Sequence, residues 1–390
     1  MTLAIQAMVA MALLTLPVMA PEIARSLGVS PALAGVYVAI VYAGAMFASL
    51  AAGAAVKRFG AIRVSQAGLL LCACGLALCA VESVAAMALG AVLIGLGYGP
   101  ITPASSHLLA RTTSPERMSL VFSVKQTGVP LGGVLAGAVV PGAALLLGWQ
   151  GALLVSAAAN VLCAAIAQPL CASLDADRDA SQPLVLGSLA QPIRLVLAHP
   201  ALRMLAACSF VFSMAQLSLT TYLVTYLHVA LSYTLIAAGA ALAVSQVAGM
   251  AGRVLWGWVA DRYTGARNML AALALLMALA ALATATLSAD MPALAVMAVL
   301  AVFGASAIGW NGVYLAEVAR RAPPGLASVA TGGTLAITFF GVVLGPPAFG
   351  AMVELFGTYR ASFALLAVPT LLCGALLMRA RHVDPVSRAP

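Results

Sequence analysis

Charged residues are scarce in this sequence. Only 8% of its 390 residues are Asp, Glu, Lys or Arg, whereas 63% are hydrophobic. Soluble domains carry about 25% charged and about 45–50% apolar residues, so this chain has too few polar side chains to cover a soluble surface. Because a membrane-spanning helix needs about 20 apolar residues, twelve of them would use roughly 240 residues. The composition therefore predicts a polytopic helical membrane protein.

Lysine is nearly absent, and cysteine forms no pattern. Lys57 and Lys125 are the only lysines, and neither precedes Ser or Thr, which excludes the phosphate-binding loop of an ATP-driven pump. The seven cysteines show neither metal-ligand spacing nor a disulfide framework, so we expect no metal and no cofactor. The net charge of +8 is interpreted as the usual excess of cations in cytoplasmic loops, not as a surface for nucleic acid.

Charged and turn-forming residues divide the chain into twelve apolar stretches. They run near residues 2–24, 32–56, 64–81, 84–110, 118–146, 150–171, 202–228, 233–260, 268–288, 291–318, 326–353 and 359–379. The first stretch lacks a basic segment before it, so we interpret it as a span and not as a signal peptide. A longer polar segment predicts an N-terminal six-helix half at 1–172, a cytoplasmic linker at 173–200, and a C-terminal half with a short cytoplasmic tail at 201–390.

The cations are distributed unequally between the two sides of the predicted membrane. With the N-terminus inside, fifteen Lys and Arg residues lie on the cytoplasmic side, and only Arg25 and Arg360 lie outside. The positive-inside rule then predicts that both termini are cytoplasmic, and we expect the protein in a bacterial inner membrane. The two remaining cations, Lys125 and Arg253, lie inside spans.

The two halves repeat each other at an offset of 204 to 209 residues. The matching pairs are Gly53 with Gly257, Arg58 with Arg262, Pro115 with Pro324, Ser119 with Ser328, and Gly148 with Gly357. Two parallel six-helix halves are what such a repeat implies.

Over essentially its whole length the chain resembles the major facilitator superfamily of twelve-helix transporters. The loop Gly257-x-x-x-Asp261-Arg262 is similar to the family's signature between the second and third helices of each half. Lys57 stands where that signature has Asp in the first copy. We expect Gly257 to let two helices approach closely and Asp261 to pair with nearby arginines. The resemblance implies a conformational latch made of Gly257, Asp261, Arg262, Arg267, Gly53 and Arg58.

Lys125 and Arg253 are the leading candidates for a binding site, because charge inside a span is costly and normally marks function. Lys125 shares a helix face with Gly128 and Gly132, which predicts a packed environment and not lipid. The fifth and eighth helices are neighbours across the halves in the superfamily, which implies that both cations converge there. A glycine-flanked arginine at this place resembles the monocarboxylate transporters and the oxalate–formate exchanger, where it binds the carboxylate. The alternatives are that Lys125 snorkels to the cytoplasmic face and that Arg253 serves the latch.

Polar and aromatic side chains complete the predicted substrate site. They lie on helices that line the cavity in this superfamily, although interhelical hydrogen bonding is an alternative role for each polar one. The predicted substrate-binding residues beside the two cations are Gln216, Asn311, Trp310, Tyr314, Tyr98 and Tyr222. His107 and Glu317 are candidates for proton coupling. Their alternative roles are a satisfied histidine near a helix end and a partner for Arg320 or Arg321.

No Asp or Glu lies at mid-membrane, and the drug-antiporter pattern Gly-Pro-x-x-Gly-Gly is incomplete at residues 129–133. We therefore predict a secondary active transporter, not an enzyme, that carries a small organic anion by alternating access. The anion is expected to be a mono- or dicarboxylate, moved with a proton or exchanged for another anion. The alternative is a drug or metabolite exporter of the same superfamily.

Two further classes find little support. Gly304-Ala-Ser306 resembles a rhomboid-type serine motif, but no histidine lies on a later span. No filter-like repeated loop indicates a channel. The expected partners are thus the anion and the lipid bilayer, without nucleic acid, and we expect a monomer.

Overall fold

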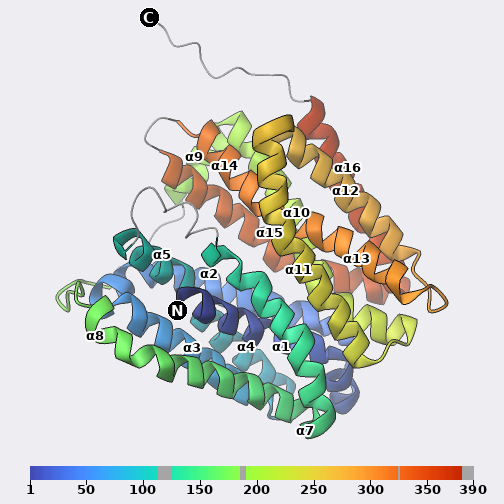
Figure 1. Ribbon diagram of the computed structural model, residues 1–390, viewed down its shortest axis with the longest axis horizontal. Helices are drawn as coiled ribbons and strands as arrows, with labels where there is room; N and C mark the ends of the chain where they lie inside the picture. The colour runs from blue at the N-terminus through green and yellow to red at the C-terminus, as the bar shows by residue number, and fades with distance from the viewer. Residues whose placement is uncertain (113–123, 185–189, 324–325, 380–390) are drawn as a thin grey trace, which may run out of the picture.

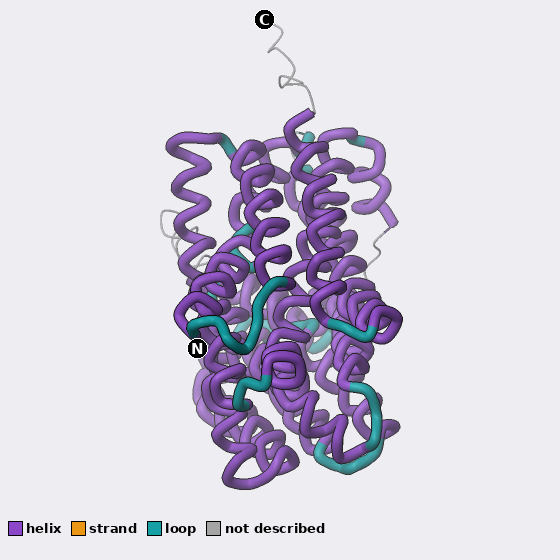
Figure 2. The backbone as a smooth tube through the Cα atoms, turned by 90° about the vertical axis from the view of Figure 1, so that its right-hand side faces the viewer, coloured by secondary structure: helices purple, strands orange, loops and turns teal. Residues whose placement is uncertain are grey.

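The computed structural model describes residues 1–112, 124–184, 190–323 and 326–379. Within these ranges nearly all of the chain is helical and no strand occurs, as Figure 2 shows by its colouring. Eleven helices there are long and apolar enough to cross a membrane. One of them, Val124–Leu174, combines two predicted spans, because its helix turns at Gly148, whose φ of 73° and ψ of 170° are not helical. Divided at Gly148, the described helices give the twelve predicted spans, and the predicted all-α fold class is confirmed.

The helices form two sets joined by a linker. The first set is α1 (Thr2–Leu27), α2 (Ala34–Phe59), α3 (Ala61–Cys79), α4 (Val84–Tyr98), α5 (Ile101–Thr112) and α7 (Gly128–Ala167). The linker region holds α8 (Cys171–Leu174) and α9 (Ala190–Ala198). The second set is α10 (Pro200–Thr225), α11 (Leu235–Val259), α12 (Ala266–Ala285), α13 (Ala293–Ala307), α14 (Asn311–Arg321), α15 (Ala327–Phe356) and α16 (Tyr359–Arg379). Figure 1 shows the two sets lying against each other, the first mainly blue to green and the second yellow to red. Pro115, Ser119 and Pro324 of the predicted repeat, and the tail from residue 380, lie outside the described ranges.

The fourth and tenth predicted spans are each broken in the middle. The fourth divides into α4 and α5 at Gly99 and Pro100, since proline has no N–H to offer a helical hydrogen bond. The tenth divides into α13 and α14 at residues 308–310, where the Trp256 indole donates to the Ala305 carbonyl at 2.7 Å. Such breaks leave main-chain carbonyls available to side chains at membrane depth.

The two halves touch along several helix pairs, and α1 is the most enclosed of the described spans. In its most apolar window 83% of the residues are buried, and it packs against α7 of its own half and α10 of the other. The halves also meet where α7 packs against α11 and α2 against α15. A Cβ on Gly137 would lie 2.4 Å from the Gly239 carbonyl oxygen, and the reverse distance is 2.3 Å. Glycine at both positions therefore lets the two main chains come into contact.

Side-chain contacts between the halves gather at the end that is predicted to face outward. The Tyr222 hydroxyl on α10 donates to the Ala32 carbonyl at 2.6 Å and to the Pro346 carbonyl at 2.9 Å. Ser30, which precedes α2, hydrogen-bonds to Glu354 on α15. Toward the other end, α5 packs mainly on α1, α2 and α3, and α14 mainly on α10, α11, α12 and α15, each within its own half. The halves are thus held together most firmly at the predicted outer end.

Candidate substrate site between the two halves

Arg253 lies on α11 and reaches across to the first half. Its Nε donates to the Ile308 carbonyl at 3.1 Å, and its Nη1 donates to the Gln126 carbonyl at 3.0 Å. Both carbonyls are free at helix breaks: Pro130 lacks the N–H that would otherwise bond Gln126, and Ile308 lies just beyond the end of α13. A guanidinium carries five N–H donors, so three of them remain for a ligand.

Lys125 lies one residue from the carbonyl-bearing Gln126 and is only 2% exposed. Among the described residues its Nζ has one long contact, 3.5 Å to Oε1 of Gln126. In the part of the chain that the structure describes, no carboxylate forms an ion pair with Lys125 or Arg253. Among the described residues, two cations from different halves thus lie inside the membrane-spanning region without acidic partners, and Arg253 is bound to the residue that follows Lys125.

A small cavity of about 30 Å³ lies between the halves, and neither Lys125 nor Arg253 is among the residues that line it. Ile308, whose carbonyl binds Arg253, is one of its lining residues, and Val129 and Pro130 of α7 are others. Its walls come from α1, α2, α4, α7, α10 and α11. The polar lining residues are Tyr42, Tyr98, Gln216, Thr220 and Gln246. We define this set of walls, with Lys125 and Arg253, as the central site.

Three of the predicted site residues form one hydrogen-bonded cluster at the central site. Gln216 Oε1 accepts from the Trp310 indole at 3.1 Å and from the Asn311 amide at 3.5 Å. Trp310 is 1% exposed and sits at the break between α13 and α14, with its ring 5.2 Å from that of Tyr314. The cluster thus links α10 to the broken tenth span, and Tyr314 lies behind Trp310 rather than in the cavity wall.

Tyr98 reaches the cavity from α4, and its ring meets that of Tyr42 edge-on at 5.8 Å. Tyr222, by contrast, is completely buried at the predicted outer end, where it stacks on Phe349 at 4.8 Å. The structure therefore brings Tyr98 to the central site and does not bring Tyr222 there.

Two glutamines at or beside this region were not among the predicted site residues. Gln246 lines the cavity and is 3% exposed. Gln6 on α1 is fully buried; its Oε1 accepts from Thr102 at 3.2 Å, while its Nε2 has no partner in the described part of the chain. Gln216 and Asn311 were predicted because an amide side chain is unusual inside an apolar span. Gln6 and Gln246 carry the same signal in the sequence.

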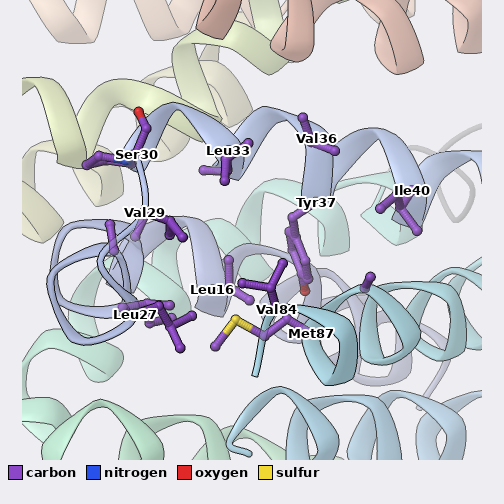
Figure 3. Close-up of a pocket in the computed structure, with 16 residues that line it drawn as sticks. Leu16, Leu27, Val29, Ser30, Leu33, Val36, Tyr37, Ile40, Val84 and Met87 are labelled. Atoms are coloured by element: carbon purple, nitrogen blue, oxygen red, sulfur yellow. The ribbon is translucent and has the colours of Figure 1, made fainter. Parts of the chain in front are cut away.

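A second and larger cavity, about 140 Å³, lies near the predicted outer ends of α1, α2 and α4 (Figure 3). Leu16, Leu33, Val36 and Met87 are typical of its lining, which is apolar apart from Ser30 and the Tyr37 hydroxyl, among 16 residues. No charged side chain lines it, and none of the predicted site residues does. Size alone would favour this cavity, but an apolar wall cannot replace the hydration of a polar or charged substrate. The smaller central site is therefore the better candidate.

The predicted latch of the C-terminal half lies at the predicted inner end. Asp261 is 3.8 Å from Arg320, which also approaches Glu317 at 3.2 Å. Arg267 donates to the Leu377 and Met378 carbonyls at the end of α16. Glu317 thus lies among arginines near the inner end of α14.

The close helix approach predicted at Gly257 is absent from this structure. A Cβ on Gly257 or on Gly53 would meet no atom within 4 Å. The predicted close approach is therefore not found in this structure, because no atom of the described residues lies against either glycine. Close contact of this kind occurs at Gly137 and Gly239 instead.

The first-half loop lacks the signature Asp, and the linker supplies acidic residues beside it. Asp175 accepts from the main-chain N–H groups of Ile62 and Arg63, at 2.8 and 3.0 Å, and so caps the start of α3. Gly60 has a φ of 99°, and a Cβ there would collide with the Asp175 side chain. Arg58 donates to the Gln182 carbonyl at 3.1 Å. The linker therefore packs against the loop that resembles the family signature.

Asp177 joins the linker to the inner end of the fourth span. It accepts from His107 Nε2 at 2.7 Å and forms an ion pair with Arg111. Desolvation alone would raise the pKa of Asp177, but the His107 hydrogen bond and the Arg111 charge together hold the pKa of this carboxyl below its ordinary value. His107 is thus bound to the linker and lies away from the central cavity.

Replacing Asp177 by Asn is expected to lower the melting temperature of the detergent-solubilised protein at neutral pH by roughly 2–4 °C, since about 1 kcal/mol of charge-assisted hydrogen bonding is lost. A lowered folded-state pKa means that this stabilisation is present above the ordinary Asp pKa of about 3.9 and is lost as pH falls through the folded value. The difference should therefore shrink near and below about pH 4. Asp290→Asn, at an exposed site, is the control. Equal melting temperatures at neutral pH would contradict the Asp177 contacts.

The comparisons with known proteins agree with this architecture. A family model described as Major Facilitator Superfamily matches residues 2–335. A bacterial homologue of the human lysosomal transporter Spinster, in an inward-facing and occupied conformation, is 17% identical with a TM-score of 0.78, and the match covers 100% of this chain and 98% of that one. The nucleoside transporter NupG is 17% identical with a TM-score of 0.78, covering 97% and 98%. The peptide transporter POT in complex with sulfate is 17% identical with a TM-score of 0.74, covering 97% and 92%.

A comparison with curated proteins found no match. At 17% identity the solved structures show the fold alone, and their names point to different cargoes, so they leave the cargo of this chain open. The family model covers most of the chain and indicates a membrane transporter, not an enzyme. The chain belongs to the Major Facilitator Superfamily.

Proposed function

We propose that the protein is a secondary active transporter of a small organic anion, a mono- or dicarboxylate. The observation that carries the proposal is the pair of intramembrane cations, Lys125 and Arg253, which come from different halves and have no acidic partner among the described residues. Alternating access between the halves would expose this pair to each side of the membrane in turn.

The electrostatics of the central site favour an anion. A buried charge without a partner costs several kcal/mol, and a carboxylate entering the site would neutralise it. Arg253 keeps three N–H donors free while its other two are held by main-chain carbonyls. A guanidinium fixed in this way presents a planar fork that matches a carboxylate. A cationic drug would meet repulsion at the same place.

The contacts between the halves support a definite conformation. They lie at the end that the distribution of cations predicts to be outside, so the central site would open toward the cytoplasm in this structure. Transport would require the outer contacts of Tyr222 and Ser30 to break while the inner ends come together. A proton or a second anion would accompany or exchange with the substrate.

Counterflow in proteoliposomes tests the proposal. Liposomes loaded with one unlabelled compound are assayed for accelerated entry of its labelled form, with mono- and dicarboxylates, a nucleoside, a dipeptide and a cationic drug, at two pH values. Acceleration by carboxylates alone is the expected result. Acceleration only by the cationic drug or by a neutral metabolite would support the alternative, an exporter of such compounds.

The orientation gives a separate prediction. Reporter fusions in a bacterial host should show fluorescence of a green fluorescent protein placed after Arg379 and activity of alkaline phosphatase placed after Asp290, because fifteen of the nineteen cations then lie on the cytoplasmic side. A phosphatase fusion after Asp179, in the linker, serves as the inactive control. The reverse pattern of reporter activity would mean that the central site opens away from the cytoplasm in this structure.

A further inference from the structure

We infer that the substrate is a dicarboxylate and that Gln216 and Gln246 provide the hydrogen-bond donors that select it over a monocarboxylate of equal length. The inference rests on the proposed function. It is carried by the orientation of the Gln216 amide, by the Gln246 amide in the wall of the same cavity, and by the unpaired cations Arg253, which binds the carbonyl of the lining residue Ile308, and Lys125.

The orientation of the Gln216 amide follows from its partner. An indole N–H is a donor only, so the Gln216 atom 3.1 Å from Trp310 Nε1 has to be the oxygen. Asn311 donates to the same oxygen. The Gln216 NH₂ group is thereby directed away from this pair, and Gln216 is a lining residue of the cavity. The two N–H donors of Gln216 are thus available to a ligand.

Gln246 supplies a second amide to the same cavity. It is 3% exposed, and its side chain packs so closely on Gly133 that a Cβ there would lie 2.4 Å from Gln246 Nε2. Within the described residues its side chain makes no hydrogen bond, although it lines the cavity. An amide without a protein partner at a cavity wall can donate to an acceptor of a ligand that enters the cavity.

The balance of charges and hydrogen bonds then defines the ligand. Lys125 and Arg253 together require two negative charges, and no acidic side chain lines the cavity. A monocarboxylate supplies one charge and two acceptor oxygens, which leaves one cation and at least one amide without a partner. A dicarboxylate supplies two charges and four acceptor oxygens, which matches two cations and two amides. A substrate with an amino end would meet only donors at its second end.

Gln216→Glu is the discriminating variant because it is nearly isosteric. The new carboxylate still accepts from Trp310 and Asn311, but it replaces the donors facing the cavity with a negative charge. Gln246→Leu removes the second amide at similar volume. Gln168→Glu is the matched control, since Gln168 lies far from the cavity and its side-chain oxygen accepts from Gln66, a bond that Glu retains.

The experiment measures half-saturation in counterflow for straight-chain mono- and dicarboxylates compared at equal chain length. The wild type and Gln168→Glu should prefer the dicarboxylate by about 100-fold, and this preference should fall by roughly 10-fold or more in Gln216→Glu and in Gln246→Leu, with a smaller change for the monocarboxylate. Melting temperatures in detergent identify any variant that has not folded, in which case the other one decides.

An unchanged preference in both folded variants, or a wild type that prefers the monocarboxylate, would overturn the assignment while leaving carboxylate transport intact. If no carboxylate of either class supports counterflow in the wild type, the proposed function itself fails, and the inference fails with it. The two failures are therefore distinguishable within one set of measurements.

Discussion

Carboxylate transport is expected to fall by at least about 100-fold in Arg253→Ala and in Lys125→Ala. Removing one of two cations that share an anion leaves part of its charge buried without a partner, which costs about 3–5 kcal/mol, and each 1.4 kcal/mol is roughly tenfold in affinity. Half-saturation in counterflow should rise accordingly. Arg253→Lys should recover part of the activity, because it keeps the charge and loses the two-pronged geometry.

Lys57→Ala is the matched control for the lysine. Lys57 is the other lysine of the chain, is exposed at the predicted inner end of α2, and should leave carboxylate transport unchanged. Arg253→Ala also frees the Gln126 and Ile308 carbonyls, so the melting temperature of each variant is needed beside its transport. Wild-type transport in both alanine variants would rule out the central site.

Replacing Gly137 by Val should abolish transport, with a loss of more than about tenfold. A Cβ at Gly137 would lie 2.4 Å from the Gly239 carbonyl oxygen, which is main chain and cannot move aside without separating α7 from α11. The halves could then no longer close at the predicted outer end, and the cycle would stop before the substrate is released to the other side.

Gly142→Val controls for the effect of valine in the same helix. A Cβ at Gly142 would meet no atom within 4 Å, so only the small propensity cost of a β-branched residue remains. Ligand binding, measured as stabilisation in detergent by the transported carboxylate, should persist in Gly137→Val because the central site is untouched. Transport at the wild-type rate in Gly137→Val would show that this contact does not have to form.

The helices and their ends were largely predictable from the sequence. A membrane span needs a long apolar run, and glycine and proline often mark where such a run ends. The boundary predicted between the spans at 118–146 and 150–171, for example, coincides with the non-helical Gly148. The broken fourth and tenth spans were less visible. Pro100 gives a reason for the first break, whereas the second lies at residues 308–310, where no proline occurs and the hydrogen bonds of Trp256 and Arg253 accompany it.

Individual site residues could be predicted from the sequence only where the residue type is unusual inside a membrane span. Lys125 and Arg253 stand out because a charge inside an apolar run is improbable without a reason. Tyr222 has the same character as Tyr98 in the sequence, yet one lies in the outer contact between the halves and the other at the cavity. A tyrosine suits both places, and only the packing of the neighbouring helix separates them.

Composition and residue order determine three features: the unpaired positive charge inside the spans, the number of spans, and the direction of the positive-inside asymmetry. All three depend on the transfer of side chains between water and lipid. Only the tertiary structure decides which hydrogen-bond partner each polar group has. Gln126 offers Arg253 a carbonyl only because Pro130 cannot bond it and α11 lies alongside. The Gln216 oxygen is held by the Trp310 indole, which leaves the Gln216 NH₂ group for other partners. Such contacts join residues that are distant in sequence, so no local pattern can specify them.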